Sequence, residues 1–303
     1  MEQDMEQDDV FETLTSLWRA YKTGDPNVVT SVRCYLMFVW MLATAFVMNI
    51  GNEMADRNRP DSRDLLPDLV LDNVDPEFGS PFLADYLVGV HVLIMLYVAS
   101  CSSISTVIAR RFYTIYGALN LFRALTISLT QLPDPSPRCT RPETLRESSG
   151  QTHVLLCALR MMFPMGLVTC GDLIFSGHSV IIVLTMLFWI RYYPTITLGP
   201  VAYAKNLAHP VFSVVVKYGI VAFSSFSLYC IIATRLHYTT DVAIAIYITF
   251  FAVQAYERAV RSPWIRAQSP FLCWLEAYVD LRDRIVPFEH AVLPLGVAVA
   301  QTL

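Results

Sequence analysis

The sequence predicts an all-α, polytopic membrane protein with six transmembrane helices and both termini in the cytosol. Three observations support this fold class. Apolar residues make up 54% of the 303 residues, whereas charged residues make up only 16%. The apolar residues gather in runs close to the roughly 20 residues that an α-helix needs to cross a bilayer. The net charge of −4 argues against a nucleic-acid partner.

Six apolar runs account for the predicted spans. They are Cys34–Asn52, Tyr86–Ala109, Phe112–Gln131, Leu173–Ile190, Val211–Thr234 and Val242–Tyr256. The last run is short, so its helix is expected to begin earlier, at His237 or Tyr238. An even number of spans places both termini on the same side of the membrane.

The domain organisation follows from these runs. Residues 1–33 are expected to form a cytosolic tail with a short amphipathic helix near Phe11–Tyr21. Residues 34–258 form the six-helix catalytic domain, and residues 259–303 form a cytosolic C-terminal tail. The segments predicted to be cytosolic carry twelve arginines and lysines, against eight in the other loops. This bias favours cytosolic termini, because positive residues gather on the cytosolic side.

The segment before the fourth run is apolar but is interrupted by charge and proline. We expect His153–Val168 to be a lumenal re-entrant or interfacial piece rather than a span. The seven cysteines show no spacing typical of a metal site. Cys139, Cys157 and Cys170 lie in this one inter-helix region, where an extracytoplasmic location would allow a disulfide. The sequence does not determine which of them would pair.

Two short segments carry the candidate chemistry. They are Cys170–Ser179, with the sequence CGDLIFSGHS, and His237–Asp241, with the sequence HYTTD. His237 and Asp241 are four residues apart, so on a helix they lie on the same face. A carboxylate beside an imidazole sets its tautomer and stabilises its positive charge. His178, in the first segment, could pass a proton to a leaving group as a second histidine.

The topology predicts that these two segments meet. Two predicted spans separate His178 from His237, so both are expected on the lumenal or exoplasmic face. Two histidines and one aspartate at a membrane surface indicate phosphoryl-group transfer on a lipid. The alternative interpretation is that each histidine is a hydrogen-bonded structural residue near a helix end.

Three further charged residues are candidates for substrate binding. Arg123 lies inside the third predicted span, where a charge is costly and therefore suggests function. It is predicted either to clamp a phosphate oxygen or to hold helices together in a buried ion pair. Arg235, two residues before His237, is a second candidate clamp. Asp172 is expected either to cap the fourth span or to attract a cationic head group.

The motifs resemble those of the sphingomyelin synthase family, also called sphingolipid synthases, within the lipid phosphate phosphatase superfamily. The resemblance covers most of residues 34–258 and is nearest to the kinetoplastid type. Ser179 stands where the family usually has threonine, and the prolines upstream of the first motif are missing. The four matching motifs are Leu66-Pro67-Asp68, then Arg110-Arg111 with Phe122-Arg123 and Thr130, then Cys170-Gly171-Asp172 with Ser176-Gly177-His178-Ser179, and His237-Tyr238-Thr239-Thr240-Asp241-Val242 with Ala245 and Thr249.

This resemblance implies a reaction and its catalytic residues. A phospho-head-group passes from a glycerophospholipid to the primary hydroxyl of ceramide, which releases diacylglycerol. His237 would attack phosphorus and carry it as a phosphohistidine, or would act as base on the ceramide hydroxyl. Asp241 would orient His237 and stabilise positive charge on its imidazole. His178 would protonate the departing oxygen. The scheme needs no cofactor and no metal.

The resemblance also implies the partners and the compartment. The substrates are ceramide and phosphatidylcholine or phosphatidylethanolamine, which give sphingomyelin or ethanolamine phosphorylceramide. An acidic Asp172 near the site favours these cationic donors over phosphatidylinositol. The protein is expected in the Golgi or the plasma membrane, and a homo-oligomer is compatible with the sequence.

Three other functions remain as alternatives. An inositol phosphorylceramide synthase differs only in its head group. A lipid phosphate phosphatase uses water in place of ceramide, but Cys230 and Ile231 occupy the positions where that group has Ser-Arg. A non-catalytic membrane protein, such as a scramblase or scaffold, predicts that alanine at His178 and His237 leaves lipid composition unchanged.

Overall fold

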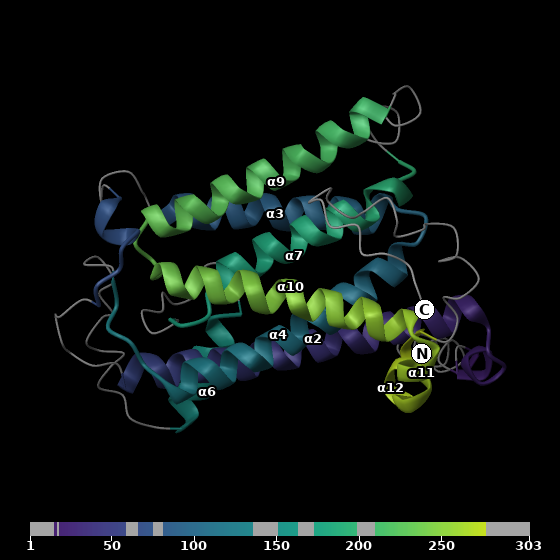
Figure 1. Cartoon of the computed structure of the whole chain (residues 1–303). Helices are drawn as coiled ribbons and strands as arrows, with labels where there is room; N and C mark the ends of the chain where they lie inside the picture. The colour runs from purple at the N-terminus through teal and green to yellow at the C-terminus, as the bar shows by residue number, and fades with distance from the viewer. Residues whose placement is uncertain are drawn as a thin grey trace, which may run out of the picture.

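The computed structural model describes residues 15–16, 18–58, 66–74, 81–135, 151–162, 173–198 and 210–276. These residues fold into a bundle of helices that run along one common direction (Figure 1). Among them, the only β-type pairing is an isolated bridge between Ser102 and Ile196. The predicted all-α class is therefore confirmed for the described part of the chain.

Six long helices correspond to the six predicted spans. They are α2 (Pro26–Asn58), α3 (Pro81–Cys101), α4 (Ser105–Leu129), α7 (Gly177–Tyr192), α9 (Pro210–Ala233) and α10 (Thr239–Arg261). The shorter elements are α6 (Gln151–Arg160), α11 (Pro263–Gln268), α12 (Pro270–Glu276) and the 3-10 turns η1 (Leu71–Asn73) and η3 (Tyr193–Thr195).

Four of the helices are long and apolar enough to cross a membrane. These segments are Pro26–Asn58, Phe82–Cys101, Val214–Ala233 and Thr239–Arg261. The other two predicted spans are helical, but α7 has only 16 residues. Helix α4 carries three arginines, which lower its hydropathy. The structure thus supports a multi-pass protein and leaves the number of six spans as a proposal.

Several predicted helix boundaries were wrong. Helix α2 begins at Pro26 and not at Cys34, and α7 begins at Gly177 and not at Leu173. The run Tyr86–Ala109 does not form one helix, because α3 ends at Cys101 and α4 begins at Ser105. The break is held by backbone hydrogen bonds from Ser103 N to Thr195 O and from Thr197 N to Cys101 O. Helix α10 begins at Thr239, later than predicted, because Tyr238 adopts an extended conformation as its N-cap.

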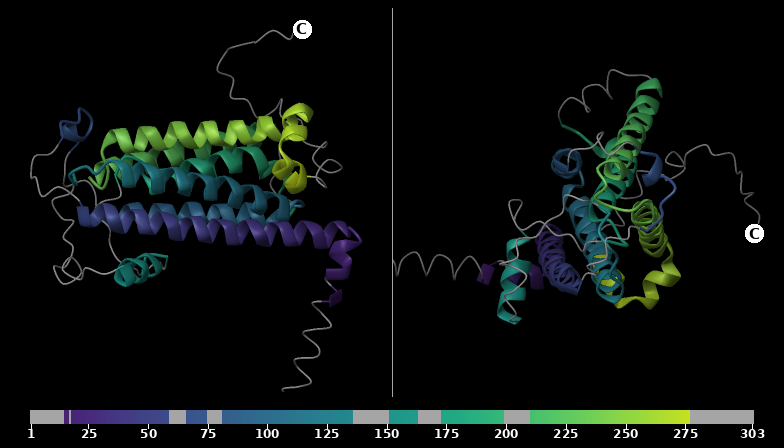
Figure 2. Two further views of the ribbon diagram at one scale, coloured as in Figure 1. Left: turned by 90° about the horizontal axis from the view of Figure 1, so that it is seen from below. Right: turned by 90° about the vertical axis from the view of Figure 1, so that its left-hand side faces the viewer.

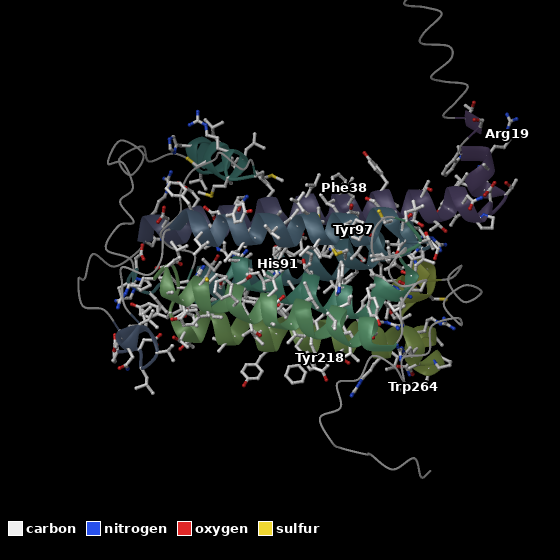
Figure 3. All side chains as sticks on the ribbon, turned by 90° about the horizontal axis from the view of Figure 1, so that it is seen from above. Arg19, Phe38, His91, Tyr97, Tyr218 and Trp264 are labelled. Atoms are coloured by element: carbon white, nitrogen blue, oxygen red, sulfur yellow. The ribbon has the colours of Figure 1, made fainter. Side chains whose placement is uncertain are left out.

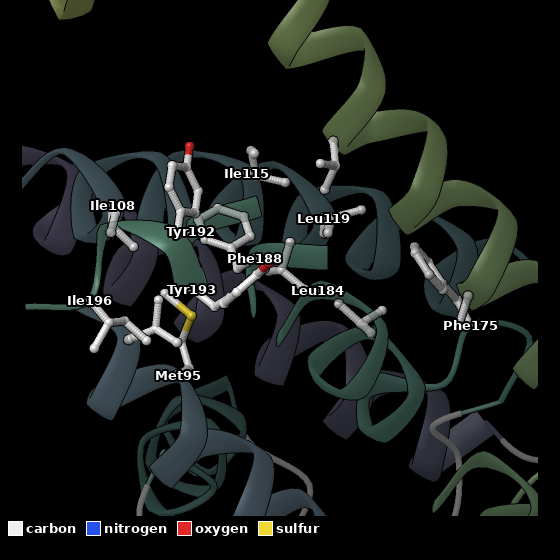
Figure 4. Packing of buried hydrophobic residues seen from close by; sticks show 14 residues of the cluster. Met95, Ile108, Ile115, Leu119, Phe175, Leu184, Phe188, Tyr192, Tyr193 and Ile196 are labelled. Atoms are coloured by element: carbon white, nitrogen blue, oxygen red, sulfur yellow. The ribbon is translucent and has the colours of Figure 1, made fainter. Parts of the chain in front are cut away.

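Helix α7 lies at the centre of the bundle and contacts α3, α4, α9 and α10. Figure 2 shows its neighbours arranged around it. Its apolar residues occupy successive positions rather than one face, which is typical of a fully enclosed helix. Val180, Leu184 and Phe188 of α7 join the largest buried cluster, together with Ile115 and Leu119 of α4 (Figure 4). This packing fixes the position of the first turn of α7.

One end of the bundle is closed by buried ion pairs. Glu276 of α12 is fully buried and lies 3.2 Å from Arg110 and 2.9 Å from Arg111. Tyr256 donates a hydrogen bond to Glu276, and Arg111 donates one to Tyr192. Burial would raise the pKa of Glu276, but the charges of Arg111 and Arg110 outweigh it and hold that pKa below its ordinary value. These ion pairs therefore hold α12 against α4.

Helix α6 lies beside α2 and outside the central group (Figure 1). It has 10 residues, which is too short to cross a bilayer. The prediction of a non-spanning piece in this region agrees with the helix, and residues 163–168 lie outside the described residues. Asn49 of α2 donates a hydrogen bond to the carbonyl of Ala158 in α6.

Candidate active site

The first turn of α7 presents the Ser-Gly-His-Ser sequence. Ser176 is the N-cap, and its hydroxyl accepts a hydrogen bond from the backbone N–H of Ser179. Such a cap satisfies one of the free N–H groups at a helix start. Gly177 is required for close packing, since a Cβ there would lie 2.6 Å from Cζ of Arg123. His178 follows directly and remains partly exposed.

Arg123 reaches this turn from α4. Its side chain is buried, and Nε donates a hydrogen bond to the carbonyl of Phe175 at 2.9 Å. Nη1 lies 3.4 Å from the sulfur of Met48. The guanidinium thus supports the backbone that leads into Gly177 and His178. The predicted phosphate clamp stays a prediction, and the structure adds this positioning contact beside it.

The first turn of α10 holds the second segment. The carboxylate of Asp241 accepts a hydrogen bond from the backbone N–H of Tyr238 at 3.0 Å, which completes the cap of the helix. The same oxygen, Oδ2, lies 3.6 Å from Nδ1 of His237. Both side chains are buried. The spacing of four residues therefore places acid and imidazole together, as the sequence predicts.

The two histidines face each other. Their ring centroids are 5.8 Å apart, and the ring planes are inclined by 62°. The backbone N–H of Ser176 donates to the carbonyl of Asp241, so the starts of α7 and α10 are tied directly. The structure brings together His178, His237 and Asp241, which are the three residues that the sequence singled out for catalysis.

Asp85 of α3 is a site residue that sequence reasoning missed. Its Oδ1 lies 3.0 Å from Nε2 of His178, and its side chain is 70% exposed. Each histidine of the site therefore has its own carboxylate, Asp85 beside His178 and Asp241 beside His237. The one available signal was an acidic residue directly before the predicted span Tyr86–Ala109.

The loop before α3 supports the start of α10. Asp68 accepts hydrogen bonds from the backbone N–H and the hydroxyl of Thr239, at 2.7 and 2.8 Å. It also accepts bonds from the backbone N–H groups of Val70 and Leu71. Burial would raise the pKa of Asp68, but these four hydrogen bonds outweigh it and hold the pKa below its ordinary value. The first motif thus has a structural role in this site.

Of the two other residues predicted to bind substrate, Arg235 lies within the described part of the chain and Asp172 does not. Nη2 of Arg235 donates to the carbonyls of Leu71 and Val74, at 3.1 and 3.2 Å. Arg235 has a φ of 55°, so the chain turns sharply here just before His237.

Asp172 lies outside the described residues, as do Cys139 and Cys170. Cys157 is present as a thiol, which contradicts a disulfide that would include it.

A buried histidine outside the site, His91, illustrates the structural alternative. His91 lies between the two ends of the bundle (Figure 3). Its Nδ1 contacts the carbonyl of Leu87 at 2.8 Å, its Nε2 contacts Ser224 at 3.2 Å, and its ring stacks on Phe223. Its polar atoms are satisfied within the bundle, in contrast to the paired rings of the site.

Residues 169–258 match the family model described as PAP2 superfamily C-terminal. This range contains His178, His237 and Asp241, together with helices α7 and α9 and most of α10. The match therefore covers both histidine segments that the sequence singled out.

Similar curated proteins specify the resemblance further. The chain is 35% identical to a phosphatidylethanolamine:ceramide ethanolaminephosphotransferase of Trypanosoma brucei brucei over 54% of this chain and 44% of that protein. It is 28% identical to a phosphatidylinositol:ceramide inositolphosphotransferase of Leishmania major, over 52% and 41% of the two chains. It is 32% identical to a phosphatidylcholine:ceramide cholinephosphotransferase 2 of Rattus norvegicus, over 48% and 36%. In each case the match spans less than half of the relative.

Proposed function

We propose that this protein is a sphingolipid synthase that transfers a phospho-head-group from a glycerophospholipid to ceramide. The observation that carries the proposal is the pair of imidazoles 5.8 Å apart, each with a carboxylate beside it. One ring can bond to phosphorus while the other exchanges a proton with the lipid oxygen. The relatives that the chain resembles carry ceramide phosphotransferase names.

In the first half-reaction, Nε2 of His237 attacks the phosphorus of the donor lipid. Nδ1 faces Asp241, so Nε2 is the nitrogen left for the substrate. The bond between phosphorus and the diacylglycerol oxygen breaks, and His178 gives its proton to that oxygen. Asp85 stabilises the imidazolium form of His178 before the transfer. The products are diacylglycerol and a phosphohistidine that carries the head group.

In the second half-reaction, ceramide replaces diacylglycerol. The neutral His178 takes the proton of the primary hydroxyl while its oxygen attacks phosphorus. The bond to His237 breaks, and both imidazoles return to their starting states. The guanidinium groups of Arg123 and Arg235, which lie beside the site, would stabilise the phosphoryl oxygens if they turn toward them.

Phosphoethanolamine and phosphocholine are the head groups that the charges favour. Asp85 holds His178 through Oδ1, and its side chain remains 70% exposed. A carboxylate with this exposure can attract the ammonium group of a donor lipid, and it offers no such attraction to an uncharged inositol. The sequence suggested Asp172 for this role, and Asp172 lies outside the described residues. We assign the role to Asp85 instead. The relatives include transferases of all three head groups.

The proposed membrane arrangement is supported by the six long helices and by the bias of arginine and lysine toward the segments predicted to be cytosolic. All six long helices cross the membrane, both termini are cytosolic, and the site faces the Golgi lumen or the cell exterior. Helices α4 and α7 are shielded from lipid in part by their neighbours, which allows the charges of α4 and the short length of α7.

The decisive experiment is cell-free synthesis with labelled ceramide and each donor lipid in turn. The wild-type protein is expected to produce labelled ethanolamine phosphorylceramide or sphingomyelin. His178→Ala and His237→Ala are each expected to lower the rate by about 10²–10⁴-fold, the usual contribution of a general acid or base. His91→Gln serves as the matched control, because it removes a histidine outside the site.

Three results would overturn the proposal. Release of free phosphorylated head group without any labelled sphingolipid would instead indicate transfer of the head group to water. Equal activity of the His237→Ala and wild-type proteins would exclude the phosphohistidine route. Product from phosphatidylinositol alone would replace the proposed head group with inositol.

A further inference from the structure

A second polar cluster lies outside the candidate active site, between α2 and α6. Glu53 of α2 is fully buried, and His153 and Cys157 of α6 face it. His153 and Cys157 are four residues apart, so they share one face of their helix. One ligand atom from each of the three side chains lies within 4.8 Å of the other two. The sequence places Glu53 about a hundred residues away, so no spacing rule reveals the set.

The fourth member of the cluster is a cation. Nε of Arg57 lies 2.9 Å from Oε1 of Glu53, and Nη2 of Arg57 lies 3.0 Å from Nδ1 of His153. Because a guanidinium can only donate, Nδ1 of His153 carries a lone pair directed toward the positive charge. The sulfur of Cys157 lies 3.5 Å from the same nitrogen. The carboxylate and the imidazole lone pair thus contact one positively charged group, and the thiol lies beside the imidazole nitrogen.

We propose that this cluster is a binding site for a divalent zinc-like ion, which would displace Arg57 from the carboxylate and the imidazole. Sulfur, nitrogen and carboxylate oxygen are the ligand types that Zn²⁺ binds. Three protein ligands leave a fourth position for water, as is usual in zinc sites that are not fully closed by protein. A metal ion would draw the ligand atoms closer.

The arginine can leave without breaking the fold. Its side chain is 19% exposed, it lies one helical turn after Glu53, and its long stem can extend into solvent. When the ion binds, the thiol of Cys157 loses its proton and becomes a thiolate ligand. The positive charge of the site is then supplied by the metal instead of the guanidinium.

A bound ion would hold α6 against the end of the bundle that carries His178 and His237. Met48 of α2 lies beside Arg123, which supports the turn before His178. Glu53 follows Met48 after little more than one turn of the same helix. Metal binding would therefore stabilise the packing of α6 and α2 near the active site, and it takes no part in the phosphoryl transfer proposed above.

Metal binding to the purified full chain tests the proposal. The protein is prepared with a tag that lacks histidine, freed of metal with a chelator and incubated with zinc or cobalt. We expect about one zinc per chain after desalting, a thermal midpoint that rises with zinc, and a thiolate-to-cobalt charge-transfer band. The double variant His153→Ala with Cys157→Ser is expected to lose all three. Arg57→Gln is expected to bind zinc more tightly, because the competing cation is gone.

Matched variants make the outcome decisive. Cys230→Ser and His91→Gln remove a buried cysteine and a buried histidine elsewhere in the bundle, and both are expected to retain the zinc. Retention of zinc by the double variant would identify an adventitious ion and overturn the proposal. Failure of both the wild-type protein and Arg57→Gln to bind zinc would also overturn it, and would leave the cluster as an ion-pair network. None of these readouts depends on transferase activity.

Discussion

At the scale of single residues, the contact between Asp85 and His178 adds a functional group to those that the sequence indicates. The carboxylate lies 3.0 Å from Nε2 of His178 and accepts its hydrogen when that nitrogen is protonated. A negative charge beside the ring favours the imidazolium, which is the form that donates a proton to diacylglycerol. Asp85 therefore acts on the reaction through His178 and is a positioning residue.

Asp85→Asn removes this charge and keeps the size of the side chain. We expect kcat of the proposed transferase to fall about 10–100-fold, less than on loss of the histidine itself. Asp85→Glu should restore part of the rate, because it returns the carboxylate. Equal rates for Asp85→Glu and Asp85→Asn, together with lowered thermal midpoints, would show that Asp85 has only a structural role.

The residues of the site differ in how far the sequence alone could identify them. His237 and Asp241 were recognisable because both stand on one helix, where a spacing of four residues sets their proximity. His178 was recognisable from the Ser-Gly-His motif at a helix start. Asp85 was not, because its contact with His178 joins two helices whose relative rotation no local pattern determines. The cluster around Glu53 escaped prediction for the same reason.

At the scale of elements, the start of α10 depends on a loop that is distant in sequence. Asp68 accepts hydrogen bonds from the backbone N–H and the hydroxyl of Thr239. A carboxylate at a helix N-terminus also interacts favourably with the helix dipole. Since α10 carries Asp241 in this first turn, Asp68 fixes the position of the acid that pairs with His237. This gives the Leu66-Pro67-Asp68 motif a physical role.

Asp68→Ala is expected to lower the free energy of unfolding by about 2–3 kcal/mol, because it removes hydrogen bonds to a charged acceptor. The pKa of Asp68 is depressed in the folded protein. Its stabilising contribution is therefore fully present above the unfolded pKa of about 3.9 and is lost as the pH falls through the folded pKa. Thermal unfolding in detergent at pH 7 and at pH 3 measures this. The wild-type and variant midpoints should differ at pH 7 and approach each other in acid.

An equal difference at both pH values would contradict this account of Asp68. Asp72→Asn provides a matched control, since Asp72 stands in the same loop and accepts a single backbone hydrogen bond from Asp68. Its effect on the midpoint should be smaller than that of Asp68→Ala.

The elements themselves were largely predictable, and their ends were not. Long apolar runs identified all six helices, because hydropathy reflects burial in lipid or protein. The break at Ser102–Ile104 was missed, since it depends on hydrogen bonds to the distant residues Thr195 and Thr197. The 16-residue length of α7 also follows from its surroundings, because a central helix need not meet the full thickness of lipid alone.

At the scale of the whole molecule, the polar groups of the bundle divide between two ends. The histidines lie at the start of α10, and Tyr256, which contacts Glu276, lies near its end. Seventeen residues of helix separate Thr239 from Tyr256, or about 25 Å at ~1.5 Å per residue. This approaches the thickness of about 30 Å of the hydrocarbon core of a bilayer. The two ends are thus spaced to lie at opposite membrane surfaces.

The proposed orientation can be tested with two exposed positions, one at each end. Cys273 of α12 is exposed near the ion pairs of Glu276, and Leu69 beside Asp68 is 84% exposed. In sealed microsomes with the cytosolic face outward, a membrane-impermeant maleimide should label Cys273 in the wild-type protein. In the Leu69→Cys variant, the new thiol should react only after detergent opens the vesicles. Peptide mass spectrometry identifies the labelled position, and Cys273→Ser is the control for its signal. The reverse pattern would place the histidines in the cytosol, and labelling of both positions in sealed vesicles would show that the bundle does not cross the membrane between them.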